Sequence, residues 1–354
     1  MYIKSLKLQN FRNYADESFA FDPAVNLICG ENGQGKTNLL EAAAACSTMR
    51  LFRTAQKKEG LRFGENHAFI FADFLAQERD ISLELRFSRT KAMEIYKNGV
   101  RQKRQSDAQG LLKTVLFCPE DLMLVRAGAA ARRRFLDTAL CQMRPNYARY
   151  LEEYNRLHEH KTRILRDSEE KPSLLSMWED FSLRMAHIGA QIIRYRAYYC
   201  RKLLKAAAAV YADIAPHEVL SGVYKTVSSV TDPFADARTI EKQLIDHVFS
   251  HKTAEIAAKS CLSGPHKDDL ELLLDGRSAA SFGSQGQVRT CTLSLKLAER
   301  ELFFDEDGEY PVLLLDDVLS ELDRRRQDFV LNRISAGQVM ITCCEDGISE
   351  KLRA

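Results

Sequence analysis

The sequence has few of the features that would place it outside the ordinary globular proteins. Its nine cysteines contain no CxxC pair, and only Cys343 and Cys344 are adjacent. This spacing gives no support for a zinc site and predicts reduced, mostly buried thiols. The 51 Lys and Arg residues are balanced by 49 Asp and Glu residues. The total charge therefore neither indicates nor excludes a nucleic-acid partner.

No long apolar run opens the chain. Its first residues, MYIKSLKLQNFRNY, mix charged and apolar side chains, which is typical neither of a signal peptide nor of a membrane span. We therefore expect a cytoplasmic protein without a membrane partner. Internal repeats and low-complexity tracts are also lacking. A length of 354 residues with 45% apolar residues predicts about two domains, each with a core of its own.

The chain contains two kinds of hydrophobic pattern, one typical of strands and one typical of helices. Alternating apolar and polar residues before residue 125, and again after residue 256, predict strands, with Asn98-Gly99 as a hairpin turn. Between them, apolar residues recur every three or four positions, which predicts two long helices, over about 136–157 and 178–199, with RDSEEKPS as the turn between them. We predict an α/β domain formed by residues 1–125 and 256–354, with a helical lobe, residues 126–255, inserted into it.

The segment GENGQGKT at residues 30–37 fits the phosphate-loop pattern G-x-x-x-x-G-K-[ST] completely and lies between an apolar run and a helix-favouring segment. Glycines allow backbone N–H groups to turn toward phosphates, while Lys36 would contact the β- and γ-phosphates and Thr37 would ligate magnesium. We therefore expect ATP and Mg²⁺ as cofactors. The predicted loop residues are Gly30, Glu31, Asn32, Gly33, Gln34, Gly35, Lys36, Thr37 and Asn38.

A second motif, PVLLLDD, ends an apolar run with Asp316 and Asp317. A buried strand would deliver both carboxylates to its exposed carboxyl end, as a Walker B strand does. Asp316 would then hold the metal through a water molecule, and Asp317 would polarise the attacking water as the general base. The predicted catalytic residues are Asp317 and Lys36.

A third motif, FGSQGQVRT, places a polar turn ahead of a helix, and the segment 320–323 (SELD) follows the Walker B acids. A serine and a glycine at a helix N-terminus suit the γ-phosphate of a nucleotide held by another subunit, because backbone donors and the helix dipole both favour anions. This motif is similar to an ABC-type signature, and the segment 320–323 to a D-loop. The predicted signature residues are Ser284, Gln285, Gly286 and Gln287.

These motifs, with LKLQNFRNY, FCPEDL, RRRFLD and SGPHKDDL, occur in the order found in the RecF family, and the resemblance covers nearly the whole chain. The family is a bacterial relative of SMC and ABC-type ATPase heads. The resemblance implies an α/β fold: a P-loop ABC-type ATPase head with a mixed sheet and antiparallel strands, plus the inserted helical lobe. It also implies that Arg12 and Asn13 lie near the nucleotide base.

The function implied by the resemblance is recombinational DNA repair. An ATP-bound homodimer would clamp duplex DNA near single-strand gaps and help RecR and RecO to load RecA, and slow ATP hydrolysis would release it. Two departures from related ATPases stand out. The VMITCCED segment lacks the switch histidine of transporter ATPases, and Asp317 is one methylene shorter than their usual glutamate.

Three alternatives stay open at this point: the ATPase subunit of a membrane transporter, a kinase-like phosphotransferase, and a structural SMC-type tether. His266 could contact DNA or a second subunit, or could simply bond to its neighbours. The basic run Arg132, Arg133 and Arg134 could be a solvated face or a phosphate contact.

Overall fold

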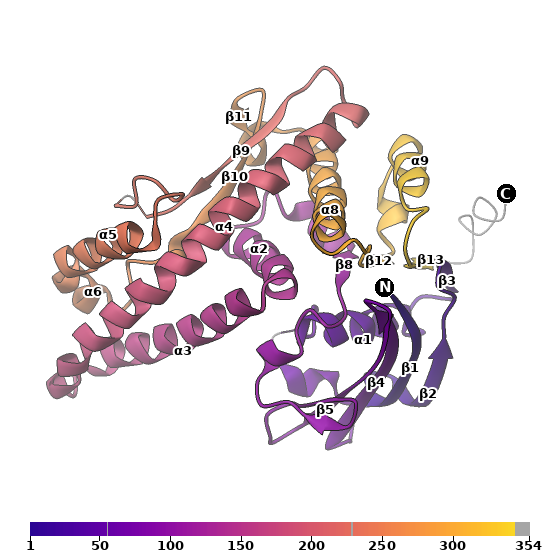
Figure 1. The fold of residues 1–354 in the computed structure, drawn as a ribbon, viewed down its shortest axis with the longest axis horizontal. Helices are drawn as coiled ribbons and strands as arrows, with labels where there is room; N and C mark the ends of the chain where they lie inside the picture. The colour runs from indigo at the N-terminus through magenta and orange to yellow at the C-terminus, as the bar shows by residue number, and fades with distance from the viewer. Residues whose placement is uncertain (55, 228, 344–354) are drawn as a thin grey trace.

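The computed structural model describes residues 1–54, 56–227 and 229–343. Figure 1 shows two parts: a compact part that carries the N-terminus and the larger sheets, and an elongated part that extends from it. Cys344 and the acidic end of the VMITCCED segment lie outside the described residues. Within these ranges, no helix is both long and apolar enough to cross a bilayer.

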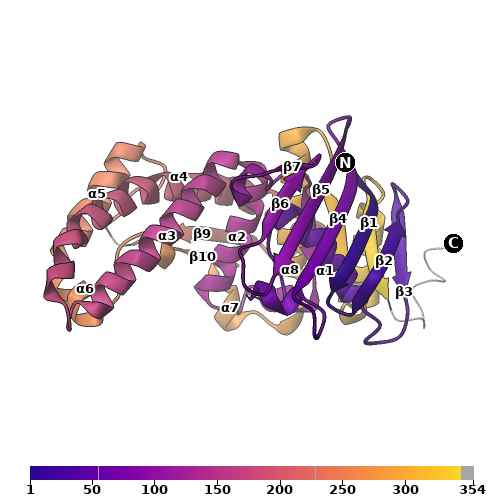
Figure 2. The ribbon, with the colours of Figure 1, turned by 90° about the horizontal axis from the view of Figure 1, so that it is seen from below.

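Six antiparallel strands form the largest sheet, in the order β2-β1-β4-β5-β6-β7, and Figure 2 shows them side by side. The strands are β1 (Tyr2–Phe11), β2 (Tyr14–Ala20), β4 (His67–Ala76), β5 (Arg79–Ser88), β6 (Glu94–Lys97) and β7 (Val100–Arg101). Alternation sends Leu6, Leu8 and Ile70 into the core. The predicted hairpin turn is confirmed, with φ of 49° at Asn98 and 76° at Gly99.

A second sheet is wholly parallel, in the order β3-β13-β12-β8. The strands are β3 (Val25–Cys29), β13 (Val339–Cys343), β12 (Val312–Asp316) and β8 (Thr114–Phe117). The parallel and antiparallel strands of the predicted α/β fold thus lie in separate sheets. Because all four strands run in one direction, their carboxyl ends share one edge, where ligands bind in such sheets.

Helices cover both faces of the parallel sheet. Val312 and Leu314 belong to the core shared with α1 (Lys36–Thr48) and the antiparallel sheet, whereas Leu313 and Leu315 belong to the core shared with α8 (Gln285–Asp307). This division follows from the two-residue repeat of a strand. Two further helices flank this part of the chain: α7 (Ala279–Phe282) and α9 (Arg324–Arg333).

The elongated part is built on α4 (Trp178–Ile214), which runs most of its length in Figure 1. Its other elements are α2 (Ala129–Met143), α3 (Pro145–Asp167), α5 (Ala237–Ser250), α6 (Lys252–Ala258), β9 (Leu220–Lys225), β10 (Asp269–Leu274) and β11 (Arg277–Ser278). The last three form a small antiparallel sheet in the order β11-β10-β9. Strand β9 was not predicted, because its pattern is only six residues long.

The first predicted long helix is wrong as a single helix. It is two helices, α2 and α3, that meet at Arg144 and Pro145. A proline disfavours helical geometry in the residue before it, and Arg144 has φ −133° and ψ 97°, an extended conformation. Pro145 then suits the first turn of α3 because it needs no backbone donor there. The turn at RDSEEKPS and the second long helix are confirmed.

One hydrophobic core joins the elongated part, called the helical part below, to α8 and to one face of the parallel sheet. The boundaries at residues 126 and 255 remain predictions. Short 3-10 helices complete the chain: η1 (Lys57–Gly60), η2 (Gln105–Asp107), η3 (Pro119–Met123), η4 (Pro172–Met177), η5 (Pro265–Lys267) and η6 (Val318–Glu321).

Candidate nucleotide site

The phosphate-loop motif connects β3 to α1 at the carboxyl edge of the parallel sheet. Gly33 and Gly35 have φ of 87° and 104°, a region that favours glycine. The Lys36 ammonium donates to the backbone carbonyl of Gly30 and, at 3.1 Å, to that of Glu31. The lysine therefore folds back over the loop, and α1 begins directly behind it, which is the arrangement of an anion site at a helix N-terminus.

The turn between β1 and β2 braces this loop. Asn13 Nδ2 donates to the carbonyl of Gln34 at 3.0 Å, and Tyr14 Oη donates to that of Gly35 at 3.0 Å. Asn38 Nδ2 donates to Asn13 Oδ1 at 2.7 Å. A Cβ atom at Gly35 would lie 2.4 Å from Asn13 Nδ2, so glycine is required for this close approach as well as for its φ.

Arg12 joins the β1–β2 turn to α1 and to the Glu59 backbone. Its guanidinium donates to both carboxylate oxygens of Glu41, at 2.8 and 3.1 Å, and to the carbonyl of Glu59 at 2.8 Å. Glu41 is fully buried in α1. Such a two-pronged pair holds the β1–β2 turn against α1. The role of Arg12 near a nucleotide base remains a prediction.

Asp316 ends β12 beside the start of α1, where Thr37 Oγ1 donates to its Oδ1 at 2.9 Å. Thr342 of the neighbouring strand β13 donates to the same oxygen at 3.0 Å. Burial raises the pKa of Asp316, the two hydroxyl donors lower it, and the carboxylates of Glu120 and Asp317 raise it further. A hydroxyl and a carboxylate in contact are the oxygen ligands that Mg²⁺ prefers.

Asp317 takes a left-handed conformation, with φ of 50°. Its backbone N–H donates to Thr342 Oγ1 at 2.8 Å, and its carbonyl accepts from Ser320 Oγ at 2.6 Å. This geometry turns the chain sharply after β12. The polar end of β12 is thus held by β13 on one side and by η6 on the other.

The predicted signature forms the N-terminus of α8. Ser284 Oγ accepts from the Gln287 N–H at 3.2 Å, and Gln287 Oε1 accepts from the Ser284 N–H at 2.7 Å, which is a reciprocal capping box. Ser284 and Gln285 are exposed, while Gly286 and Gln287 are half-buried. The serine is therefore an N-cap whatever else it does.

Side chains from two distant segments hold this turn, and α8 itself reaches the predicted D-loop. Arg326 of α9 donates to the Gly286 carbonyl at 3.0 Å, and Glu218 accepts from Gln287 Nε2 at 2.9 Å. Arg289 donates to the carbonyl of Glu321, in the predicted D-loop, at 2.6 Å. The signature and the D-loop are consequently tied into one unit.

The structure therefore assembles the predicted residues in two groups. The phosphate loop, Asn13 and Asp316 are joined by hydrogen bonds, and the signature is joined to the D-loop segment. Sequence reasoning missed Thr342, Glu41 and Glu218. Thr342 lies one position before Cys343 in the VMITCCED segment. Pairing β12 with β13 in parallel places it opposite Asp316, so a prediction of that pairing could have found it.

The SGPHKDD segment is enclosed by its neighbours. His266 Nδ1 accepts from Tyr154 Oη at 2.7 Å, and its Nε2 donates to the Cys261 carbonyl at 3.0 Å. Burial lowers the pKa of His266 to about 3. Of the two hypotheses for this histidine, the structure supports bonding to its neighbours.

The two acids that follow His266 in this segment also bond within the protein, to arginines of the basic run at 132–134. Arg132 binds Asp269 with two bonds of 2.7 and 2.8 Å, and Arg133 donates to the Asp268 carbonyl at 2.6 Å. Two members of the basic run at 132–134 therefore hold the fold together, while Arg134 is exposed.

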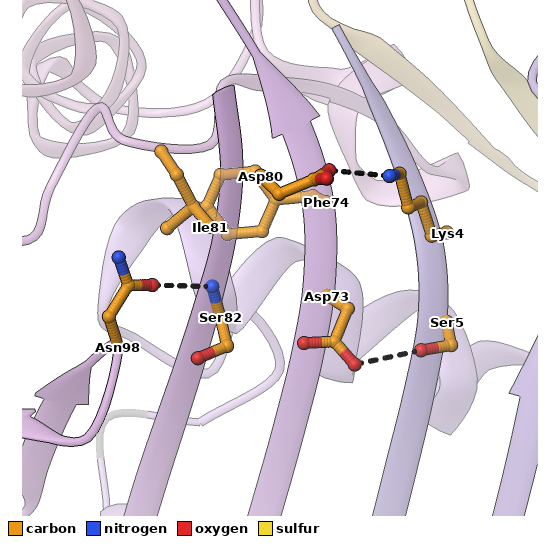
Figure 3. A pocket seen from close by; sticks show the side chains of 8 residues that line it. All are labelled: Lys4, Ser5, Asp73, Phe74, Asp80, Ile81, Ser82 and Asn98. Atoms are coloured by element: carbon orange, nitrogen blue, oxygen red, sulfur yellow. Dashed lines mark hydrogen bonds and ion pairs between the residues drawn. The ribbon is translucent and has the colours of Figure 1, made fainter. Parts of the chain in front are cut away.

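A shallow hollow on the outer face of the antiparallel sheet is a separate feature (Figure 3). Lys4 pairs with Asp80, and Ser5 Oγ donates to Asp73 at 3.3 Å. Its polar groups are thus bonded to one another across neighbouring strands, and it lies away from the carboxyl edge of the parallel sheet.

Comparisons with known proteins agree with this architecture. Residues 2–354 match the family model described as the RecF/RecN/SMC N terminal domain. The chain is 34% identical over 350 residues to the DNA replication and repair protein RecF of Acetivibrio thermocellus, covering 99% of this chain and 95% of that protein. It is 37% identical over 353 residues to RecF of Lactobacillus johnsonii, covering 99% and 94%.

Solved structures give the same result. The chain is similar to the recombination mediator protein RecF with ATPrS, in the RecFOR pathway, with a TM-score of 0.91, 32% identity, and 98% of this chain and 93% of that one covered. The Smc head domain of Pyrococcus furiosus has a TM-score of 0.54 and 15% identity, over 98% of this chain and 90% of that one. The second likeness concerns the fold alone.

Proposed function

Because the chain belongs to the RecF family of the RecF/RecN/SMC proteins, we propose that it is an ATP-dependent DNA repair protein that uses ATP as a switch. One observation carries the proposal. Thr37 Oγ1 of the phosphate loop lies 2.9 Å from Asp316 Oδ1 of the Walker B strand, and the Thr342 hydroxyl donates to the same oxygen. RecF has been solved with ATP, and these oxygens suit the magnesium of such a nucleotide.

The residues present fit magnesium well. Thr37 Oγ1 and Asp316 Oδ1 would hold the ion, which would draw charge from the β- and γ-phosphates when bound. Lys36 would leave its loop carbonyls for the phosphates. Asp317 would orient and deprotonate the attacking water, and its short side chain is consistent with slow turnover.

The signature would act on the nucleotide of a second subunit. Its turn lies at the N-terminus of a 23-residue helix, and Arg326 and Glu218 from other segments hold it in place. Two copies would enclose two ATP molecules, so the γ-phosphate would favour the dimer and hydrolysis would release it. The dimer would clamp duplex DNA near single-strand gaps through phosphate contacts, with RecR and RecO as partners in loading RecA. The RecFOR pathway named for the similar RecF structure supports these partners.

Molecular mass in solution tests the switch. We would measure light scattering of Asp317→Asn protein without nucleotide, with ADP and with ATP, each with and without a short DNA duplex. The proposal expects the mass to double only with ATP, and DNA to join the doubled species. A protein that stays monomeric with ATP fully bound would contradict it.

The signature has a sharper test with a matched control. Ser284→Ala removes both an N-cap and the proposed contact with the partner's nucleotide, whereas Asp236→Ala removes an N-cap from α5, where Asp236 accepts from two backbone N–H groups. Each change costs about 1 kcal/mol of stability. Only Ser284→Ala should abolish ATP-driven doubling. Equal behaviour of the two variants would reduce Ser284 to a cap.

A further inference from the structure

Two cysteines lie side by side beneath the phosphate loop. Cys29 ends β3 and Cys343 ends β13, and they are register partners in the parallel sheet. Their Sγ atoms are 2.9 Å apart. Directly opposed residues on neighbouring strands point to the same face, and the strand spacing of about 4.8 Å lies within the Cα–Cα range that a disulfide spans.

The two thiols differ in access. Cys29 is exposed, whereas Cys343 is 1% exposed. The other described cysteines are buried. Oxidation of cysteine requires access to the oxidant, and a nearby second thiol then resolves the product. Cys29 is placed as the thiol that reacts first and Cys343 as the one that resolves it.

We propose that Cys29 and Cys343 form an oxidation site for peroxides, and that their disulfide weakens nucleotide binding by the adjoining phosphate loop. The Cys29 thiolate would attack a peroxide oxygen, breaking the O–O bond and leaving a sulfenic acid and one water. The Cys343 sulfur would then attack the Cys29 sulfur, forming the S–S bond, breaking the S–O bond and releasing a second water. Two thiols are oxidised and one H₂O₂ is reduced, so the balance is complete.

The position of the pair explains its effect on the loop. Gly30, bonded directly to Cys29, supplies a carbonyl that accepts from Lys36, and Thr342, bonded directly to Cys343, contacts both Asp316 and Asp317. A disulfide demands a specific dihedral angle and S–S distance. Because β3 is the edge strand and β13 is held on both sides, β3 should give way, and the phosphate loop moves with it.

The effect on ATP rests on the proposed function, but the disulfide itself can be measured without nucleotide. We would treat the full chain with stoichiometric H₂O₂, block remaining thiols with N-ethylmaleimide and map linked peptides by mass spectrometry without reductant. A fluorescent ATP analogue would then report affinity before oxidation, after oxidation and after dithiothreitol.

The proposal expects a linked Cys29–Cys343 peptide and affinity that falls by about tenfold and recovers with reductant. Cys29→Ser should prevent both changes, and Cys200→Ala, which removes a buried cysteine of α4, should prevent neither. A link to another cysteine, no link, or an equal loss of affinity in Cys29→Ser would overturn it. If the reduced protein fails to bind the analogue, the proposed function fails, while the linked peptide still decides the oxidation site.

Discussion

Charged side chains gather both at the carboxyl edge of the parallel sheet and inside the helical part, and the two groups have different surroundings. At the sheet edge, Lys36 and Asp317 are partly exposed, and Asp316 accepts from the hydroxyl groups of Thr37 and Thr342. Inside the helical part, Arg196 is 3% exposed and donates to Asp137, Asp268 and the Pro265 carbonyl.

Burial and pairing of the charged groups distinguish a motif that holds the fold together from one that can bind a ligand. SGPHKDD and GENGQGKT look equally rich in chemistry as sequence. Asp268 is fully buried with Tyr224 and Arg196, and burial raises its pKa to about 6. Enclosed charges that pair with one another are costly to separate, whereas groups at an open sheet edge can still exchange partners with a ligand. Four predictions test this distinction, in decreasing order of effect.

Asp317→Asn should lower ATP turnover by about 10²- to 10⁴-fold, the usual contribution of a general base. ATP affinity and stability should stay close to wild type, because the Asp317 backbone, rather than its side chain, contacts Thr342 and Ser320. Phosphate release measures turnover, with Asp328→Asn on exposed α9 surface as the control. Unchanged turnover would remove Asp317 from the site.

Arg196→Met should destabilise the protein by about 3–5 kcal/mol, because it removes the cation that pairs with the buried Asp268 and the half-buried Asp137. Urea unfolding measures the loss. Arg184→Met is the matched control on the same helix: Arg184 pairs with Glu153 but is 48% exposed, so about 0.5 kcal/mol is expected. Equal losses would erase the contrast between enclosed and open charges.

Lys36→Ala should weaken ATP binding by about 10- to 150-fold, the value of a charged hydrogen bond of 1.5–3 kcal/mol. Thermal stability should change little, because Lys36 is partly exposed and water can replace it as the donor to the Gly30 and Glu31 carbonyls. Titration with a fluorescent ATP analogue measures the effect, with Lys7→Ala on exposed β1 surface as the control. A large loss of stability with intact binding would reverse the assignment.

His266→Gln should flatten the acid limb of the stability profile. The pKa of His266 is lowered to about 3 in the folded chain, so its contribution is complete above pH 6.5 and is lost at about 1.4 kcal/mol per pH unit below it. Asp268, with its raised pKa, acts in the opposite direction between about pH 4 and 6. The wild-type-minus-variant difference in unfolding free energy, measured from pH 7 to 5.5, isolates the histidine.

His187→Gln supplies the control for this profile, because His187 lies on α4 with its side chain 63% exposed. Parallel profiles for wild type and His266→Gln would show that His266 titrates normally and that the segment is open to water.

Several site residues could be predicted because their signal is local. The phosphate loop, the turn Asn98-Gly99 and the Ser284 cap depend on residues within a few positions of one another, where backbone geometry demands glycine or a short polar side chain. The break at Pro145 carried an equally local signal, which the three- and four-residue spacing across it concealed. Glu218 carried none, because its contact with Gln287 spans 69 positions.

By itself, the sequence determined the phosphate loop, the acids at the end of a buried strand and the capped signature turn, since each follows from conformations available to a short stretch of chain. Which of these groups share an environment depends on how the strands and helices pack. Parallel pairing brought Thr342 to Asp316 and Cys343 to Cys29, and helix packing enclosed His266 and Arg196. Burial and long-range contacts determine the pKa and the hydrogen-bond partners of a side chain. Neither burial nor long-range contact can be read from the residues next to it in sequence.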